Sequence, residues 1–236
     1  SFTLIRDAVH PDPPGQVVMA FAILNDMHVN RRVSSITASP GKRQWNVKVD
    51  NGEVSNVTYQ EGRLSFDFMA KSLPWVLPAE AALGYELAIA GHKMSVERLK
   101  VGVLPPGKYN VKIDGQTIGA WSHLTLAGKI ELQANDKTPQ YQQALQVGLL
   151  NKERNEKSIR PLRNVFRGLR DHYRKGTDKE SPEEFAAFLE KFKVQVAELE
   201  KSDKEQLAAL ESGDISTIVD KIVTACEAAE PEVRYV

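Results

Sequence analysis

The chain has 236 residues, an apolar share of 42%, and as many acidic as basic residues, so its formal net charge is zero. That length allows one large domain or about two or three small ones. A neutral chain gives no electrostatic case for binding nucleic acid or an anionic membrane, and no apolar run reaches the roughly 18 residues that span a bilayer. The single cysteine, Cys226, excludes an internal disulfide and a cysteine zinc cluster, and we expect it to be a small apolar residue of a C-terminal helix.

Residues 1–30 combine a short loop with a strongly apolar helix. The run Asp7-Ala8-Val9-His10-Pro11 lies in the loop, after a weakly alternating strand-like start. Asp12 suits a helix N-cap and Pro13 the first helical position, where its missing N–H costs nothing. The helix continues to Met27 and is apolar on almost every side. We therefore expect it to be buried on most sides, either by the rest of the chain or by another polypeptide.

Residues 31–135 alternate with a period of two, which predicts short antiparallel strands in a β-sandwich-like accessory domain. The expected strands lie at 45–49, 54–59, 64–68, 85–90, 97–104, 109–113 and 117–121. Asn51-Gly52 and Asp114-Gly115 are hairpin-turn signals. A looped stretch that contains Pro74 and Pro78 surrounds Trp75.

Residues 136–236 have helical periodicity. A helix from Pro139 is expected to kink at Pro161, because proline lacks an N–H and clashes with the preceding turn, and to end at Gly176. Residues 181–184, Ser-Pro-Glu-Glu, form a capping-box start for a second helix. That helix is expected to stop at Gly213, and a last helix to follow it.

Asp7 and His10 form the first candidate site. A carboxylate three residues before a histidine can hold one imidazole tautomer and stabilise the imidazolium that forms when the histidine takes a proton. The alternative is a structural role, in which Asp7 caps a turn and His10 packs beside Pro11. The spacing alone leaves both interpretations open.

The block from Asp7 to Pro11, followed by Gly15 and a helix that contains Met19-Ala20, resembles the last conserved block of the SGNH (GDSL-type) serine esterases. The resemblance implies that Asp7 orients His10 and that His10 is the general base in hydrolysis of a carboxylic ester through an acyl-serine. A carbohydrate acetyl ester is one candidate substrate. No metal or organic cofactor is implied. Gln16 stands where these enzymes often have a second histidine.

The same resemblance implies an α+β fold in three parts. Residues 1–30 would be the end of an SGNH α/β domain, namely a loop and its last helix. Residues 31–135 would be the β-sandwich-like accessory domain, and residues 136–236 a helical C-terminal region. Certain periplasmic or secreted esterases of this type have a similar β-rich insert, which contains a sequence segment similar to residues 104–115. The resemblance therefore also implies export from the cytoplasm.

The nucleophile of such an enzyme is missing from this sequence. Gly-Asp-Ser, Gly-x-Asn-Asp and a Gly-x-Ser-x-Gly elbow do not occur, so we do not expect this chain alone to hydrolyse an ester. The expected partner is the N-terminal half of the SGNH domain, from the same precursor or a second chain. The alternative from another class is a non-catalytic module that binds carbohydrate or a partner protein.

Two further patterns have both a structural and a functional interpretation. Five arginines recur at spacings of three and four, which places them on one helix face: Arg160, Arg163, Arg167, Arg170 and Arg174. This face is either solvated or paired with acids such as Glu183, Glu184 and Glu190, or else it binds an anionic polysaccharide or partner. Most aromatic residues of the β region are expected in the sheet core, whereas Trp75 is the candidate for a sugar-stacking platform. The remaining histidines, 28, 92, 123 and 172, show no metal-ligand spacing.

Overall fold

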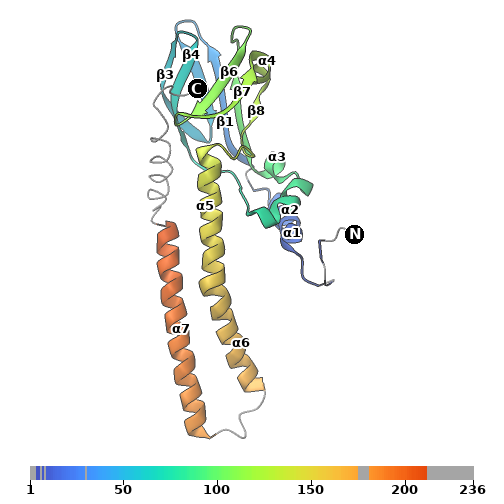
Figure 1. Ribbon diagram of the computed structural model, residues 1–236, viewed down its shortest axis with the longest axis vertical. Helices are drawn as coiled ribbons and strands as arrows, with labels where there is room; N and C mark the ends of the chain where they lie inside the picture. The colour runs from blue at the N-terminus through green and yellow to red at the C-terminus, as the bar shows by residue number, and fades with distance from the viewer. Residues whose placement is uncertain (1–3, 6, 8, 30, 175–180, 212–236) are drawn as a thin grey trace. The chain divides into compact units, whose positions relative to one another are not determined.

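The computed structural model describes residues 4–211 with the exception of 6, 8, 30 and 175–180 (Figure 1). The chain divides into two compact units. The first holds the described residues up to Gln146, and the second holds those from Val147 onward. The predicted end of a helix at Gly176, the helix after Gly213, and Cys226 lie outside the described residues.

The N-terminal helix α1 (Pro13–Asp26) begins where the sequence predicts, with Asp12 at the N-cap and proline in its first turn. The Asp12 side chain makes no capping hydrogen bond, but its carbonyl accepts the N–H of Gln16 at 2.9 Å. The short helices η1 (Ala79–Ala81) and α2 (Ala82–Leu87) pack against α1. The expectation that the rest of this chain buries α1 on most sides is wrong, because the buried residues of α1 are Gly15 and Val17.

The β region contains three sheets that surround one apolar core. A four-stranded sheet has the order β2 (Trp45–Asp50), β1 (Arg32–Pro40), β5 (Val96–Val101), β8 (Ile130–Glu131). Two hairpins are formed by β3 (Gly52–Gln60) with β4 (Arg63–Ala70), and by β6 (Lys108–Ile113) with β7 (Gln116–Ser122). The core takes Ile36 and Leu99 from the sheet, Phe66 from one hairpin and Val111 from the other. The predicted α+β class is confirmed.

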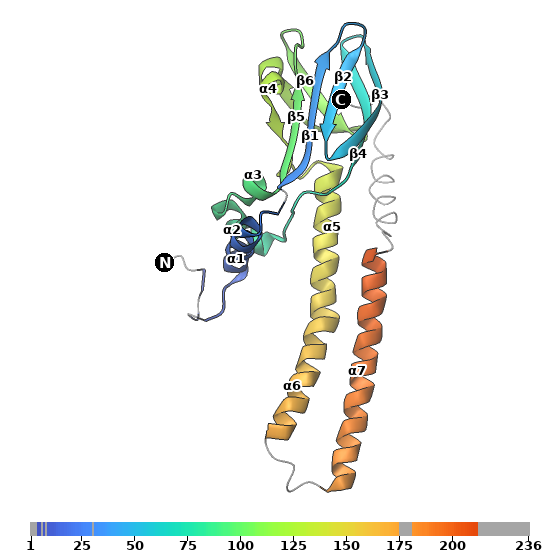
Figure 2. The same ribbon diagram turned by 180° about the vertical axis from the view of Figure 1, so that it is seen from behind.

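Three details of the β region differ from the sequence-based expectation. β1 and β5 are parallel, so the strands are not all antiparallel. Residues 85–90 form the end of α2, a turn at Ala88 and Ile89, and the start of α3 (Ala90–Met94), not a strand. The chain must cross over before β5 can run beside β1 in the same direction (Figure 2). Asn51-Gly52 does not close a hairpin, since β2 pairs with β1 and β3 with β4. Asn51 Nδ2 donates instead to the Val33 carbonyl at 2.7 Å, where the chain passes between sheets.

The last turn signal is confirmed. β6 and β7 pair from Ile113 with Gln116, and Asp114 and Gly115 have positive φ angles of 50° and 79°. Such a two-residue turn matches the twist of the strands that it joins. The helix α4 (His123–Gly128) follows β7, with the Ser122 hydroxyl accepting the N–H of Thr125 at 3.1 Å.

Three helices account for the described C-terminal part. α5 (Pro139–Arg154) continues through a π-helical turn, η2 (Asn155–Ile159), into α6 (Arg160–Arg174), and α7 (Pro182–Glu211) lies beside α6. The π-turn ends just before Pro161, where a proline ring would clash with the carbonyl four residues earlier, so the predicted irregularity is confirmed. The capping box is also confirmed, with Ser181 N to Glu184 Oε2 at 2.9 Å and Glu184 N to Ser181 Oγ at 3.2 Å.

Candidate functional site

The carboxylate of Asp7 and the imidazole of His10 are in direct contact. His10 Nδ1 lies 2.6 Å from Asp7 Oδ2, while Asp7 Oδ1 accepts the backbone N–H of His10 at 2.6 Å and that of Val9 at 3.0 Å. The His10 backbone N–H, then its imidazole, then the Val9 N–H lower the pKa of Asp7. The ionised carboxylate favours a proton on Nδ1, and Nε2 is then available as a proton acceptor on a side chain that is 82% exposed.

Backbone contacts hold the loop that carries this pair. Asp12 N donates to the Leu4 carbonyl at 2.9 Å, and Ile5 pairs with Pro11 in an antiparallel bridge. A Cβ atom at Gly15 would lie 2.6 Å from the Leu4 oxygen, so the loop can rest on the first turn of α1 because residue 15 is a glycine. The loop is thus closed at its base and placed at the start of α1.

Gln16 stabilises the same loop from within α1. Its Nε2 donates to the Pro11 carbonyl at 3.0 Å, directly after His10 in the chain. At the position where the SGNH esterases often have a second histidine, this chain therefore has a glutamine that helps to hold the loop.

One side of α1 carries an exposed apolar stripe. Met19, Ile23 and Met27 recur every four residues and are 54%, 59% and 68% exposed. The first turn of α1 packs closely against α2, because a Cβ atom at Gly84 of α2 would lie 2.1 Å from the Pro14 carbonyl oxygen. Three large apolar side chains in line on one helix face are typical of a surface that another polypeptide covers.

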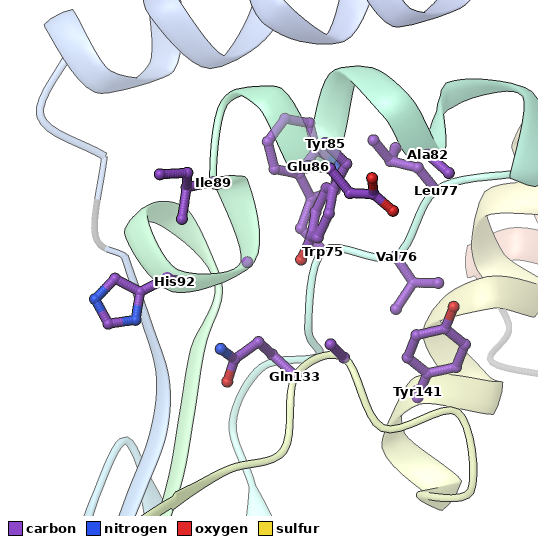
Figure 3. Close-up of a pocket in the computed structure, with 12 residues that line it drawn as sticks. Trp75, Val76, Leu77, Ala82, Tyr85, Glu86, Ile89, His92, Gln133 and Tyr141 are labelled. Carbon is purple, nitrogen blue, oxygen red and sulfur yellow. The ribbon is translucent and has the colours of Figure 1, made fainter.

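A cavity of about 420 Å³ lies on α2 and α3, and Trp75 is one of its walls (Figure 3). Trp75 is half-buried, and its ring meets Tyr85 edge-on with 6.0 Å between centroids. Its backbone N–H donates to Ser95 Oγ at 2.7 Å. Trp75 is thus part of a cavity wall and not the exposed platform that the sequence suggested.

A second histidine and carboxylate meet at the edge of this cavity. His92 Nδ1 lies 3.0 Å from both carboxylate oxygens of Glu131, which also accepts Arg98 Nε at 3.2 Å and Gln133 Nε2 at 2.8 Å. Burial alone would raise the pKa of Glu131, but the hydrogen bonds from His92, Gln133 and Arg98 outweigh it and lower that pKa. No local sequence pattern points to this pair, because 39 residues separate its two members.

The arginine face of α6 is exposed at all five positions. Among the described residues, Arg170 has a carboxylate partner, Asp171, at 3.2 Å. Of the acids proposed as partners, Glu184 bonds to Ser181 and Glu190 to Lys193. The positive charge of the arginine face of α6 is therefore exposed to solvent.

Three other aromatic residues of the β region, Trp45, Tyr109 and Trp121, belong to the core or pack against it, whereas Tyr59 is 38% exposed. Trp45 is buried, with its ring 5.0 Å from that of Tyr59. In the part of the chain that is described, no group of three or more histidine, cysteine, aspartate or glutamate side chains could hold a metal ion. No helix among those residues has both the length and the apolar character needed to cross a membrane.

No protein-family model matches the sequence, and no curated protein matches it. Among solved structures, a gut microbial diltiazem-metabolizing enzyme is similar to this chain, with a TM-score of 0.63 and 27% sequence identity. The similarity covers 86% of this chain and 55% of the other. The chain therefore spans about half the length of an enzyme whose fold it shares.

Proposed function

We propose that this chain is the C-terminal part of an SGNH-type serine esterase and supplies the histidine and aspartate of its catalytic triad. The observation that carries the proposal is the 2.6 Å contact between His10 Nδ1 and Asp7 Oδ2 in a braced loop. Asp7 holds Nδ1 protonated, and His10 Nε2 takes the proton of the serine hydroxyl as it attacks the ester carbonyl. The imidazolium then returns that proton to the leaving alcohol.

The nucleophile and the oxyanion donors come from a separate part of the SGNH domain, in the same precursor or in a second chain. Two observations support this. The stripe of Met19, Ile23 and Met27 offers that part an apolar surface on the helix that follows the loop. The similar enzyme extends well beyond the region that this chain matches. The same family resemblance points to export, and to ester substrates among which carbohydrate acetates are candidates.

The proposal is tested on the full protein, meaning this chain together with the serine-bearing part. Hydrolysis of p-nitrophenyl acetate is measured for the parent protein, for His10→Ala and for His92→Ala. We expect His10→Ala to lose activity by about 10³-fold or more, because it removes the general base. His92→Ala is the matched control, since it removes a histidine with a carboxylate partner of its own, and its activity should be close to that of the parent.

A second measurement locates the nucleophile. A fluorophosphonate reacts with an activated serine, so it should label the serine-bearing part and never this chain. Diltiazem, named for the similar enzyme, and an acetylated sugar serve as further substrates. Retention of full activity in His10→Ala would refute the proposal and favour the non-catalytic module that binds carbohydrate or a partner.

A further inference from the structure

The cavity on α2 and α3 has the size and lining of a small-molecule site. Its volume of about 420 Å³ lies within the range of roughly 300–1,000 Å³ that is usual for such sites. Trp75 and Tyr85 form one wall. Figure 3 shows Tyr141 and Val76 at one side of the cavity and Gln133 below it. Most of this lining is aromatic or aliphatic.

The polar groups of the cavity are only partly engaged, because Tyr85 Oη is buried and has no hydrogen-bond partner among the described residues. Gln133 uses its amide oxygen for the Glu97 N–H at 3.2 Å and its amide nitrogen for Glu131. Ser95 Oγ accepts the Trp75 N–H. A ligand with a hydroxyl on every carbon, such as a sugar, would find few free partners here, whereas an apolar body loses little on leaving water.

Two acceptors remain at the edge of the cavity. In the neutral imidazole, the contact of His92 Nδ1 with Glu131 favours the proton on Nδ1 and leaves Nε2 as an acceptor. The Glu86 carboxylate is the second acceptor, and none of the described residues forms an ion pair with it. Glu131 is balanced by Arg98, and Lys93 Nζ lies instead over the Phe21 ring of α1 at 5.8 Å. Glu86 is therefore the group at this edge that can pair with a cationic ligand.

The backbone at the edge of the cavity is strained. Ile89 joins α2 to α3 in the left-handed conformation, with φ 52° and ψ 38°, although it is β-branched and 52% exposed. This conformation is strained for a β-branched residue, and such strain concentrates at binding sites. Ile89 gains little burial in return and lines the cavity.

We propose that this cavity binds a small organic cation. The aromatic or aliphatic body of the ligand lies among Trp75, Tyr85 and Tyr141, and its ammonium group donates to the Glu86 carboxylate. The aromatic rings add cation–π attraction. This site is independent of the proposed esterase function, since neither Asp7 nor His10 lines it.

The test is calorimetric titration of the whole chain with three probes of similar shape, at pH 8. These are 2-phenylethylammonium, neutral 2-phenylethanol and anionic 3-phenylpropionate. We expect saturable binding with affinity in that order. Glu86→Gln should weaken the ammonium probe by about three- to tenfold and leave the alcohol unchanged, because one partly exposed charge contact is lost. Glu61→Gln, in the exposed turn between β3 and β4, is the matched control.

A steric variant tests the place of binding. Ala134 is exposed and lines the cavity, so Ala134→Trp should fill it without disturbing the core and should abolish binding. Ala186→Trp, on the exposed face of α7, should have no effect. The proposal is overturned if no probe binds up to about 10 mM, if the anion binds as well as the cation, or if Ala134→Trp leaves binding intact. Displacement of the ammonium probe by a neutral monosaccharide would likewise overturn it and assign the site to carbohydrate.

Discussion

The first compact unit holds two histidine–carboxylate pairs that differ in how they are built. Asp7 and His10 are three residues apart, lie in one loop, and have side chains that are 55% and 82% exposed. Glu131 and His92 are 39 residues apart, come from β8 and α3, and are 28% and 56% exposed. The first pair is held by the backbone N–H groups of its own loop, and the second by Arg98 of β5 and by Gln133, which follows β8.

This difference shows what each pair is ready to do. The local pair has an exposed imidazole, and neither Asp7 nor His10 lines the cavity on α2 and α3, so the proposed reaction needs another surface to complete its site. The long-range pair already borders a cavity and has its carboxylate neutralised by an arginine. The two proposals accordingly place proton transfer at the first pair and ligand binding in the cavity that the second pair borders.

The largest expected effect separates the two pairs by activity. Asp7→Asn in the full protein keeps the shape of the loop but no longer fixes the proton on Nδ1. We expect kcat for p-nitrophenyl acetate to fall by about 10³- to 10⁴-fold. Glu131→Gln, the equivalent change in the second pair, should leave kcat near the parent value. Equal losses in both variants would show that the two pairs do not have separate roles.

A third carboxylate, that of Glu97, has no partner among the described residues and so shows by contrast what the partners of the other two provide. Glu97 of β5 is 3% exposed, its Oε2 has no hydrogen-bond partner among the described residues, and burial raises its pKa from 4.5 to about 7. The facing residue in β1, Ser34, has an equally unpartnered hydroxyl. The folded chain thus keeps the Glu97 proton at pH values where the unfolded chain has already lost it.

This raised pKa makes Glu97 destabilising at neutral and higher pH. Between pH 4.5 and about 7 the unfolded state ionises first, so the Glu97 contribution to the free energy of unfolding falls by about 3 kcal/mol and stays low above pH 7. Glu97→Gln should therefore be more stable than the parent by about 3 kcal/mol at pH 8 and by little at pH 4. Urea unfolding at both pH values measures this. An advantage that does not grow with pH would contradict it.

The smallest expected effect compares the two pairs by stability. A double-mutant cycle of His92→Ala and Glu131→Ala should give a coupling energy of about 1 kcal/mol, reduced by partial exposure. The same cycle for Asp7 and His10 should give a smaller coupling, because both side chains are more exposed. Urea unfolding at pH 8 provides all the values. A larger coupling in the exposed pair would mean that its loop, and not only its chemistry, depends on the contact.

Local signals in the sequence predicted local structure well. The capping box at Ser181, the turn at Asp114-Gly115 and the irregularity before Pro161 each depend on a few neighbouring residues, and all three are confirmed. The contact of Asp7 with His10 was predictable for the same reason, since a three-residue loop brings both side chains together without help from the rest of the fold.

Errors arose where pairing depends on distant segments. The alternation at 85–90 fits a strand or a short helix, and the crossover into parallel β5 decides for the helix. The turn at Asn51 resembles a hairpin turn, but hydrogen bonds to Val33 and Ser72 direct the next strand into another sheet. Neither choice can be made from short-range periodicity.

The sequence by itself determined the loop of Asp7 and His10, the helix that follows it, and the charge and apolar pattern of α6 and α7, because each is a matter of neighbouring residues and helical spacing. Only the tertiary structure decided where α1 stays uncovered, which strands are parallel, and that Trp75, Glu86 and His92 line one cavity. The physical reason is that burial and long-range contacts arise from packing between segments, and packing joins residues that no local pattern connects.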